Sequence, residues 1–473
     1  MLQRQSQYDP GFAAFGGGSA DTVLHPPVLI ALALLVVAIL VVRRKHVLIP
    51  LLLGLLVIPA NENWYVGGIH LYTYRILILV ALMRVLASRP KAAKFFAGGF
   101  LLIDKLFLVW ALYRAIAVIL LFMQAGALVG EVAFLLDAIG GYLLLRTLIR
   151  NEEDIINVVQ VCAVVAVMCA AGMVREQLTG ENVFAPIGGR PIPDLRNGHF
   201  RAQAVFGHAI LAGSFGATTF PMFLWLWKSG KAKIIAAMGI VSSSVMALAC
   251  ASSTPIIAWL GAIGAICLWP IRWQMRWVRW AIVASLIGLQ IVMKAPVWFV
   301  ISHVDIGGGS SWERAYLIDT CIRHFKDWWL IGTKDNMNWG WDMWDQCNQF
   351  VSEAETGGLV ALGCFIAMFV YCFRKIGIAR KAVAGNHEKE WQMWFLGVTM
   401  FAQLLAFMGI DYFDQAKFLW FALLAIVPAA TMAIGSSKVR KPKPILTNEN
   451  LERSPVDTIR TEAELSISHQ LVD

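Results

Sequence analysis

The sequence predicts an all-α, polytopic integral membrane protein, and three observations support this prediction. Hydrophobic residues make up 58% of the 473 residues and charged residues 15%, whereas a soluble domain carries about 25% charged residues. Apolar runs long enough to cross a bilayer core of about 30 Å recur along the chain. Lysine and arginine gather in alternate short connections between these runs, as the positive-inside rule describes. Because lipid offers backbone groups no hydrogen-bond partner, we expect the runs to be helices.

The apolar runs define the expected elements in chain order. A polar segment, residues 1–26, comes first, and the membrane domain follows from 27 to 434. Within it we expect about 12 or 13 transmembrane helices of about 15 to 25 residues each. The first two runs are short, so a re-entrant hairpin is the alternative to two full spans. The runs are 27–42, 47–60, 69–87, 98–122, 127–149, 155–174, 205–227, 234–250, 254–270, 278–293, 354–373, 391–409 and 416–434.

The basic clusters predict the orientation in the membrane. If every cluster is cytoplasmic, the amino terminus lies outside and the tail 435–473 lies inside. The long connections 175–204 and 294–353 then face the extracytoplasmic side. The tail contains too few apolar residues to fold alone, so we expect it to be disordered. The net charge of +9 needs no nucleic-acid partner, because the basic residues fall in connections: Arg43–Lys45, Arg89–Lys94, Arg146–Arg150, Lys228–Lys233, Arg272–Arg279 and Arg374–Lys381.

The connection 294–353 is long and rich in residues that carry chemistry. Ile318, Ile322, Phe325 and Trp329 recur at helical spacing while charged residues face elsewhere, so an amphipathic helix is expected over 311–330. We expect this helix to lie along the extracytoplasmic face of the membrane. Tryptophans interleaved with charges stack on polar ring-shaped ligands such as sugars, and interfacial anchoring is their alternative role.

Three charged residues fall inside expected spans at a similar depth. With the orientation above, Arg75, Arg114 and Glu131 all lie within about two turns of the outer face. Such charges are costly in lipid and persist where they face a water-filled or protein-lined cavity. Their shared depth predicts one polar cavity that opens outward beneath the 294–353 connection. Snorkelling, or a structural Arg114–Glu131 ion pair, is the alternative.

Two further carboxyl groups lie inside expected spans. Asp104 is near the inner end of its span beside Lys105, and we expect these two to form a structural pair. Asp137 is close to the middle of its span, where a buried carboxyl group can be neutral.

The stretch 175–208 concentrates arginine on the side that ordinarily avoids it. Arg175, Arg190, Arg196 and Arg201 fall within it, and His208 opens the next run. The planar guanidinium fork binds phosphate oxygens at two points and does not lose its charge. A diphosphate-bearing lipid is therefore the expected ligand, and a solvated basic loop is the alternative.

Familiar catalytic motifs are absent from the sequence. There is no GxxxxGK[ST], no HExxH and no CxxC, which removes support for P-loop nucleotide hydrolysis and for zinc hydrolysis. Asp342 and Asp345 could share one helical face and hold a metal ion, but solvation is the expected role of both. We expect no cofactor.

Several short motifs follow one another in a recognisable order. They are Phe206–Gly213, Ala251–Thr254, Gly309–Arg314, Leu330–Gly332, and Asn348–Phe350 leading to Glu355–Leu359. In this order and on these sides of the membrane they resemble the O-antigen ligase and polymerase-like superfamily of bacterial envelope proteins. Ligases of that family carry His, then Asn, Ser or Gln, then nine residues and Gly. Asn348 and Gly358 fit this frame, but Cys347 occupies the His position, so the imidazole is missing.

The resemblance implies transfer of a glycan from a polyprenyl diphosphate carrier to an acceptor hydroxyl, on a glycan or a lipid, outside the bacterial cytoplasmic membrane. The family arginines correspond to Arg201 and Arg314, which we expect to converge with Arg75 or Arg114 and offset the diphosphate charge. A carboxylate would accept the hydroxyl proton. The candidates, in order, are Glu353, Asp345 and Glu355, and the substrate-binding set is completed by His208, Asn348, Arg190 and Arg196.

Two questions about activity stay open at this stage. The sequence does not distinguish a ligase from a polymerase, and it names neither sugar nor acceptor. A different class, a non-catalytic protein that exports or handles lipid-linked polysaccharide, is the alternative that Cys347 favours.

Overall fold

The computed structural model describes residues 22–67, 69–88, 96–304, 311–340, 343 and 347–439, with the side chains of 433 and 435–439 left out. The chain divides into one unit of Met1–Ala433 and another of Ile434–Asp473, and the fold below is that of the first unit. The amino-terminal residues 1–21 and most of the expected tail therefore lie outside the described part.

The all-α prediction is confirmed for the described residues. Helices cover nearly every expected apolar run, and the two antiparallel strand pairs, β1 (Asn63–Val66) with β2 (Ile69–Tyr72) and β3 (Asp194–Arg196) with β4 (His199–Arg201), are short. The helices are α2 (Pro26–Val41), α3 (Leu48–Val57), α4 (Thr73–Ala87), α5 (Leu102–Phe122), α6 (Ala125–Leu135), α7 (Gly141–Leu148), α8 (Glu152–Thr179), α9 (Ala209–Lys228), α10 (Lys233–Ala249), α11 (Ser253–Cys267), α12 (Met275–Val292), α13 (Ser311–Arg323), α14 (Phe325–Trp328), α15 (Gln349–Ala382), α16 (His387–Phe407) and α17 (Ala416–Val439).

Helix length and composition support a membrane protein. In the described part of the chain, 6 helical segments are long and apolar enough to cross a membrane: Leu102–Phe122, Ala125–Leu148, Glu152–Thr179, Ala209–Lys228, Trp269–Val292 and Gln349–Ala382. Four more apolar helices are shorter: Pro26–Val41, Lys233–Ala249, Ser253–Cys267 and Ala416–Met432.

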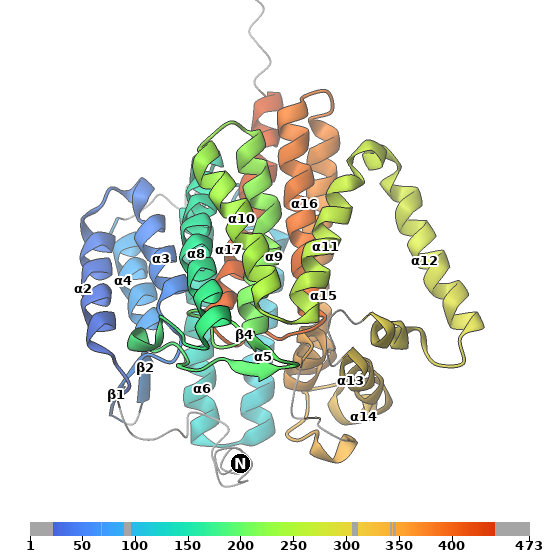
Figure 1. Cartoon of the computed structure of the whole chain (residues 1–473), viewed down its shortest axis with the longest axis horizontal. Helices are drawn as coiled ribbons and strands as arrows, with labels where there is room; N and C mark the ends of the chain where they lie inside the picture. Colours follow the sequence, from blue (N-terminus) through green and yellow to red (C-terminus); the bar gives the residue numbers. More distant parts are fainter. Residues whose placement is uncertain are drawn as a thin grey trace, which may run out of the picture. The chain divides into compact units, whose positions relative to one another are not determined.

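The helices pack around α9, whose span is 94% buried. It contacts α8, α10, α11 and α16, while α5 packs along α15. Close approach needs small residues here, because a Cβ added at Gly216 of α9 would lie 2.6 Å from the Ser243 carbonyl oxygen of α10. In contrast, α12 stands apart from the other helices (Figure 1), and none of its span is buried. It contacts mainly the 3-10 segments on either side, η6 (Trp269–Gln274) and η7 (Val297–His303).

Three of the expected continuous helices are interrupted within their length. The run 127–149 is α6 and α7 joined by a π-helical turn, Leu136–Gly140. The amphipathic helix expected over 311–330 breaks at His324 into α13 and α14. In α15 the backbone leaves helical geometry at Gly357 and Gly358, and Gly358 has φ +62°.

The break in α15 is locked by a second glycine. A Cβ at Gly358 would lie 2.2 Å from the Leu330 carbonyl oxygen, and a Cβ at Gly332, where φ is +85°, would lie 2.2 Å from the Glu355 carbonyl oxygen. Two backbone bonds, Leu359 N–H to Trp329 O and Thr333 N–H to Glu355 O, join the segments at 2.8 Å each. The motifs Leu330–Gly332 and Glu355–Leu359, far apart in the sequence, therefore form one interlocked structure.

The basic connections gather at one end of the helices, which we call the basic end. Arg150 is an electrostatic neighbour of Arg44. The ion pairs Lys231–Glu152, Lys389–Glu152 and Arg272–Glu390 join the starts or ends of α8, α10, α11 and α16 there. At the opposite, hairpin end lie both strand pairs, α13 and α14, as Figure 1 shows. Contacts at that end include Arg201–Ser252, Gly207–Asp414 and Asn348–Met408.

Candidate functional site

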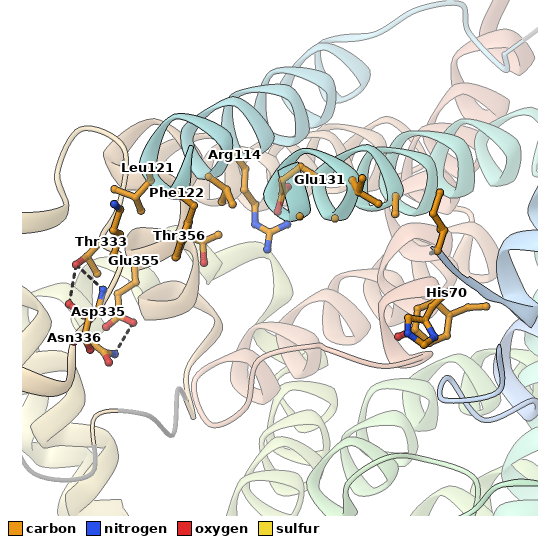
Figure 2. Close-up of a pocket in the computed structure, with 18 of the residues that line it drawn as sticks. His70, Arg114, Leu121, Phe122, Glu131, Thr333, Asp335, Asn336, Glu355 and Thr356 are labelled. Carbon is orange, nitrogen blue, oxygen red and sulfur yellow. Dashed lines mark hydrogen bonds between the residues drawn. The ribbon is translucent and has the colours of Figure 1, made fainter. Parts of the chain in front are cut away.

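A cavity of about 690 Å³ opens at the hairpin end. Its walls come from β2, the first turn of α4, the end of α5 and the start of α6. Residues 333–336 of the expected 294–353 connection and residues 355–356 of α15 complete them. Figure 2 shows how these segments surround it. The lining residues are Ile69, His70, Tyr72, Arg75, Arg114, Val118, Leu121, Phe122, Gly126, Val129, Gly130, Glu131, Ala133, Thr333, Lys334, Asp335, Asn336, Glu355 and Thr356.

The three charged residues that were expected inside spans line one cavity together. Arg75, Arg114 and Glu131 all line it, and Thr333–Asn336 line it from the long connection. The Arg114 guanidinium lies 4.0 Å from the centre of the Phe134 ring, and it attracts both Glu131 and Glu353 electrostatically. The ion pairs found among the described residues do not include Arg114–Glu131, so the structure does not support the alternative of a direct pair.

Arg75 is held by a buried carboxylate. Its Nε and Nη2 donate to Asp137 Oδ1 and Oδ2 at 2.8 and 3.1 Å. Tyr74 Oη and Lys417 Nζ also donate to Asp137 Oδ2, at 3.0 and 3.1 Å. The expectation of a neutral Asp137 is therefore wrong, because two cations and a hydroxyl favour the ionised carboxylate. Asp137 lies in the π-helical turn, a feature that is frequent at functional sites.

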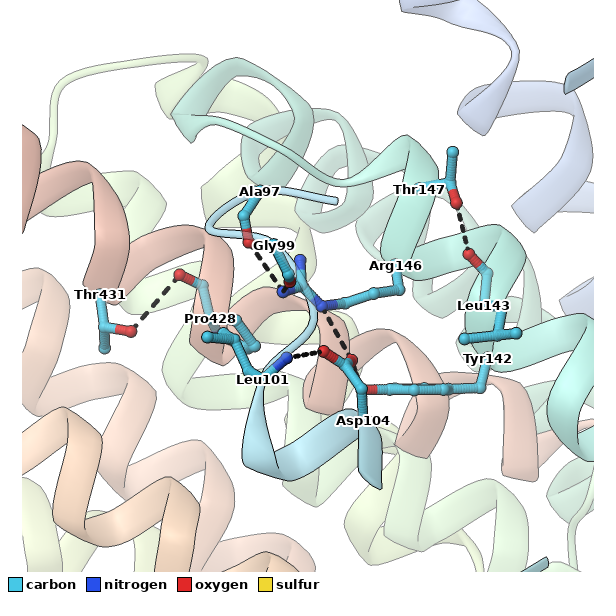
Figure 3. Close-up of polar contacts among 10 residues, drawn as sticks. All are labelled: Ala97, Gly99, Leu101, Asp104, Tyr142, Leu143, Arg146, Thr147, Pro428 and Thr431. Carbon is cyan, nitrogen blue, oxygen red and sulfur yellow. Dashed lines mark hydrogen bonds and ion pairs between the residues drawn. The ribbon is translucent and has the colours of Figure 1, made fainter. Parts of the chain in front are cut away.

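Asp104 has a similar arrangement with different partners. Its Oδ1 accepts from Tyr142 Oη at 2.6 Å and from Arg146 Nε at 3.2 Å (Figure 3). Arg146 is fully buried and donates from Nη2 to the carbonyl oxygens of Ala97 and Gly99. The expected Asp104–Lys105 pair is thus replaced by an Asp104–Arg146 pair, which fixes the chain that enters α5.

Of the three candidate carboxylates, Glu355 lines the cavity. Its Oε2 accepts from Asn336 Nδ2 at 2.9 Å, and the interlocked glycines hold its backbone. Glu353, ranked first from the sequence, is 3% exposed and does not line the cavity. It accepts from Trp110 Nε1 at 2.6 Å and from Gln349 Nε2 at 2.8 Å. Asp345, like Asp342, lies outside the described residues.

The arginines of the stretch 175–208 lie elsewhere at the hairpin end. Arg201 Nη2 donates to Ser252 Oγ at 3.0 Å. Burial lowers the pKa of Arg201, and neighbouring Arg196 lowers it further, while Asp194, Cys250 and Cys347 oppose the shift. Arg190 is about half exposed and pairs with Asp194 at 2.8 Å. None of these arginines lines the cavity.

The remaining sequence candidates have other positions. Arg314, 5% exposed, is on the buried side of α13, so neither it nor Arg201 converges with Arg75 and Arg114 on the cavity as expected. Asn348 caps α15, since its Oδ1 accepts from the Phe350 and Val351 amides at 2.9 and 3.3 Å. His208 caps α9 in the same way through Nδ1 and the Ile210 amide, at 3.2 Å. Asparagine is a preferred residue at the start of a helix, so the sequence offered a signal for the Asn348 cap.

The tryptophans of the long connection that the structure describes do not line the cavity. Trp328 is buried and donates from Nε1 to the Cys321 carbonyl oxygen at 2.7 Å. Trp312 stacks on Tyr316, and Trp339 stacks on His324. Trp341 and Trp344 lie outside the described residues.

Sequence reasoning missed Lys417, the second cation on Asp137. The signal was present, because Lys417 is a charge in the first turn of an expected span, the same feature that singled out Arg75. It also missed the polar lining residues His70, Lys334 and Asn336. Lys334 and Asn336 fall in the expected connection 294–353, where polar residues are ordinary, and His70 is the second residue of the expected run 69–87.

The described residues contain no group of three or more His, Cys, Asp and Glu side chains placed to hold a metal ion. Compared with known proteins, the sequence matches no family model and no curated protein.

Proposed function

We propose that this chain is a multi-pass protein of a bacterial cytoplasmic membrane that moves a glycan from a polyprenyl diphosphate carrier to an acceptor hydroxyl. The observation that supports this most is the composition of the cavity wall. Two arginines and two glutamates, Arg75, Arg114, Glu131 and Glu355, face one space at the hairpin end. Such a mixture suits a ligand with both an anionic group and hydroxyls.

The orientation follows from the charges. In this proposal the basic end faces the cytosol and the hairpin end faces the extracytoplasmic side. In this proposal the 6 long and four shorter apolar helices, together with α3, α4 and α16, make up the 12 or 13 expected spans. The connections 175–204 and 294–353 are then external, and the cavity opens where a carrier in the outer half of the bilayer presents its headgroup.

The chemistry assigned to the residues is a substitution at the anomeric carbon. The acceptor oxygen forms a bond to that carbon while the bond from carbon to diphosphate oxygen breaks, and the electron pair leaves with the diphosphate. Arg75 and Arg114 stabilise the charge that develops on this leaving group. Glu355 accepts the hydroxyl proton.

Fixed geometry supports these assignments. Arg75 is held at two points by Asp137, so little reorganisation accompanies the change of charge. Glu355 is held by Asn336 and by the interlocked glycines. All lining residues come from the hairpin end, which favours chemistry at one membrane face over an export path between both faces.

The experiment that tests the proposal is an analysis of carrier-linked and surface glycans in cells lacking this chain. Accumulated short carrier-linked units indicate a polymerase, and accumulated long ones indicate a ligase. Unchanged carrier-linked and surface glycans would contradict the proposed function.

A further inference from the structure

The corner between α11 and α12 at the basic end is unusually rich in tryptophan and arginine. Its sequence from Trp269 to Trp280 reads WPIRWQMRWVRW. Three of its tryptophans, Trp273, Trp277 and Trp280, are 50%, 74% and 64% exposed. Exposed tryptophan beside arginine is typical of the level of lipid headgroups, where an amphipathic ring is stable.

A buried arginine of another helix lies beneath this corner. Arg380, near the end of α15, is 8% exposed, and its Nη2 donates to the Arg272 carbonyl oxygen at 2.8 Å. Its guanidinium carbon lies 5.2 Å from the Trp273 ring centre and 5.4 Å from that of Trp394. Its Nη1 is buried and has no hydrogen-bond partner among the described residues.

The charges of the corner do not balance. Arg272 and Arg279 are electrostatic neighbours of Arg380, and Glu390 is the neighbouring carboxylate. Glu390 already accepts from Arg272 Nε at 3.3 Å and from the Gly385 amide at 2.8 Å. Arg380 thus has two cationic neighbours and one carboxylate, with a buried N–H to spare. Arg279 is exposed, but Arg272 and Arg380 are largely buried, and an excess of buried positive charge is costly unless an anion offsets it.

We propose that this corner binds the phosphate of an anionic phospholipid headgroup. Phosphate oxygens match the guanidinium fork and would accept from the spare Arg380 N–H. The exposed tryptophans and the apolar surface of α12 would contact the glycerol and acyl chains of the same molecule, which a free phosphate lacks. The site lies at the end of the helices opposite to the cavity, so it does not depend on the proposed glycan transfer.

The test uses the full chain purified in a neutral detergent. Short-chain phosphatidylglycerol, phosphatidylcholine of the same chain length and inorganic phosphate are titrated separately, and binding is measured by native mass spectrometry. We expect saturable binding of one phosphatidylglycerol, and no comparable binding of phosphatidylcholine or of inorganic phosphate. Equal binding of all three, or of inorganic phosphate alone, would overturn the lipid site.

Variants locate the site. Arg380→Gln and Arg279→Gln are each expected to weaken phosphatidylglycerol binding by about tenfold or more. Arg276→Gln removes the same charge from an exposed position in the same corner and is expected to weaken binding by less than about twofold. An effect of Arg276→Gln equal to that of Arg279→Gln would show attraction by net charge and overturn the proposal. Arg279 is exposed, so Arg279→Gln is expected to fold. This variant therefore tests the lipid site even if Arg380→Gln fails to fold.

Discussion

Arg75 and Asp137 are joined at two points, Nε to Oδ1 at 2.8 Å and Nη2 to Oδ2 at 3.1 Å, with Arg75 in the cavity wall and Asp137 behind it. Lys417 contacts the same carboxylate. The group therefore carries one positive charge in excess of its carboxylate, and this excess lies directly behind the surface that we assign to an anionic leaving group.

Asp137→Asn is expected to disturb both stability and glycan transfer. It leaves two cations partly buried without their anion, and breaking a buried pair in this way costs about 3–5 kcal/mol. Transfer per folded molecule should also fall, because Arg75 is no longer fixed. Thermal unfolding of the purified protein and carrier-linked glycan analysis measure the two effects.

Asp104→Asn is the matched control for this change. Asp104 likewise binds one tyrosine and one arginine, Tyr142 and Arg146, but none of the three lines the cavity. It should lower stability while transfer per folded molecule is unchanged. Equal losses of transfer in both variants would show that Asp137 acts through stability alone.

Gly358→Ala is expected to disrupt the interlocked segment that carries Glu355. A side chain there needs φ near +62° and meets a carbonyl oxygen at 2.2 Å, which costs about 1–3 kcal/mol from backbone conformation alone. Gly377→Ala is the control in the same helix, since its Cβ would meet nothing within 4 Å. That change should be neutral or should stabilise by about 0.5–1 kcal/mol. Unfolding temperatures that fall equally for both variants would contradict the interlock.

Asp414 is expected to make stability depend on pH. Its carboxylate accepts from the Gly207 and Ala416 amides at 2.9 and 2.8 Å, and burial raises its pKa to about 6. Between about pH 4 and pH 6 the folded state holds a proton that the unfolded chain has released. This contribution to stability is present below that window and is lost as the pH rises through it, by at most about 1.4 kcal/mol per pH unit.

Asp414→Asn removes this titration. The amide cannot accept from both backbone N–H groups at once, so the variant should be less stable than the unchanged protein at pH 4. Because only the unchanged protein loses the Asp414 contribution as the pH rises, the difference between the two should shrink between about pH 4 and pH 6. Unfolding temperatures of the two proteins between pH 4 and pH 7 give the difference. A difference that stays constant across that range would refute the role assigned to Asp414.

The proposed orientation predicts which end is accessible from outside the cell. With Cys267, Cys347 and Cys364 replaced by Ser, Lys334→Cys at the hairpin end should react with an impermeant thiol reagent in intact cells. Lys231→Cys at the basic end should react only after the membrane is permeabilised, because that end faces the cytosol in the proposed orientation. Both positions are exposed on the protein surface, so burial does not limit either reaction. The reverse pattern would overturn the orientation and the extracytoplasmic cavity with it.

Most helices were predictable because an apolar run leaves the chain no other stable form in lipid. The run 98–122 corresponds to α5, Leu102–Phe122, and the run 254–270 corresponds to α11, Ser253–Cys267. The break in α15 was not predictable, since a Gly-Gly pair inside an apolar run does not reveal which segment packs against it. Leu330–Gly332 supplies that partner only in three dimensions.

The residues of the site were predictable where the energetic cost of placing a charge inside a membrane span singled them out. Arg75, Arg114 and Glu131 stood out because isolated charges are rare in spans. The choice between Glu353 and Glu355 could not be made in the same way. The two side chains are two residues apart on a helix and so point about 200° apart. The sequence does not say which of these two sides of the helix faces the cavity. The order of the motifs led us to expect Arg201 and Arg314 in one cavity with Arg75 or Arg114, but neither of them lines it.

The most direct test of the central claim is the profile of carrier-linked glycans in cells that produce Arg114→Gln or Glu355→Gln as their sole form of this chain. Losses of about 10²-fold or more in transfer are expected for both, since one removes a charge that stabilises the leaving group and the other removes the proton acceptor. Carrier-linked glycan should therefore accumulate as it does without the chain. Arg323→Gln and Glu388→Gln, at exposed positions away from the cavity, should leave the profile unchanged. A normal profile for Arg114→Gln and Glu355→Gln, with both proteins folded and present in the membrane, would contradict the assignment of glycan transfer to this cavity.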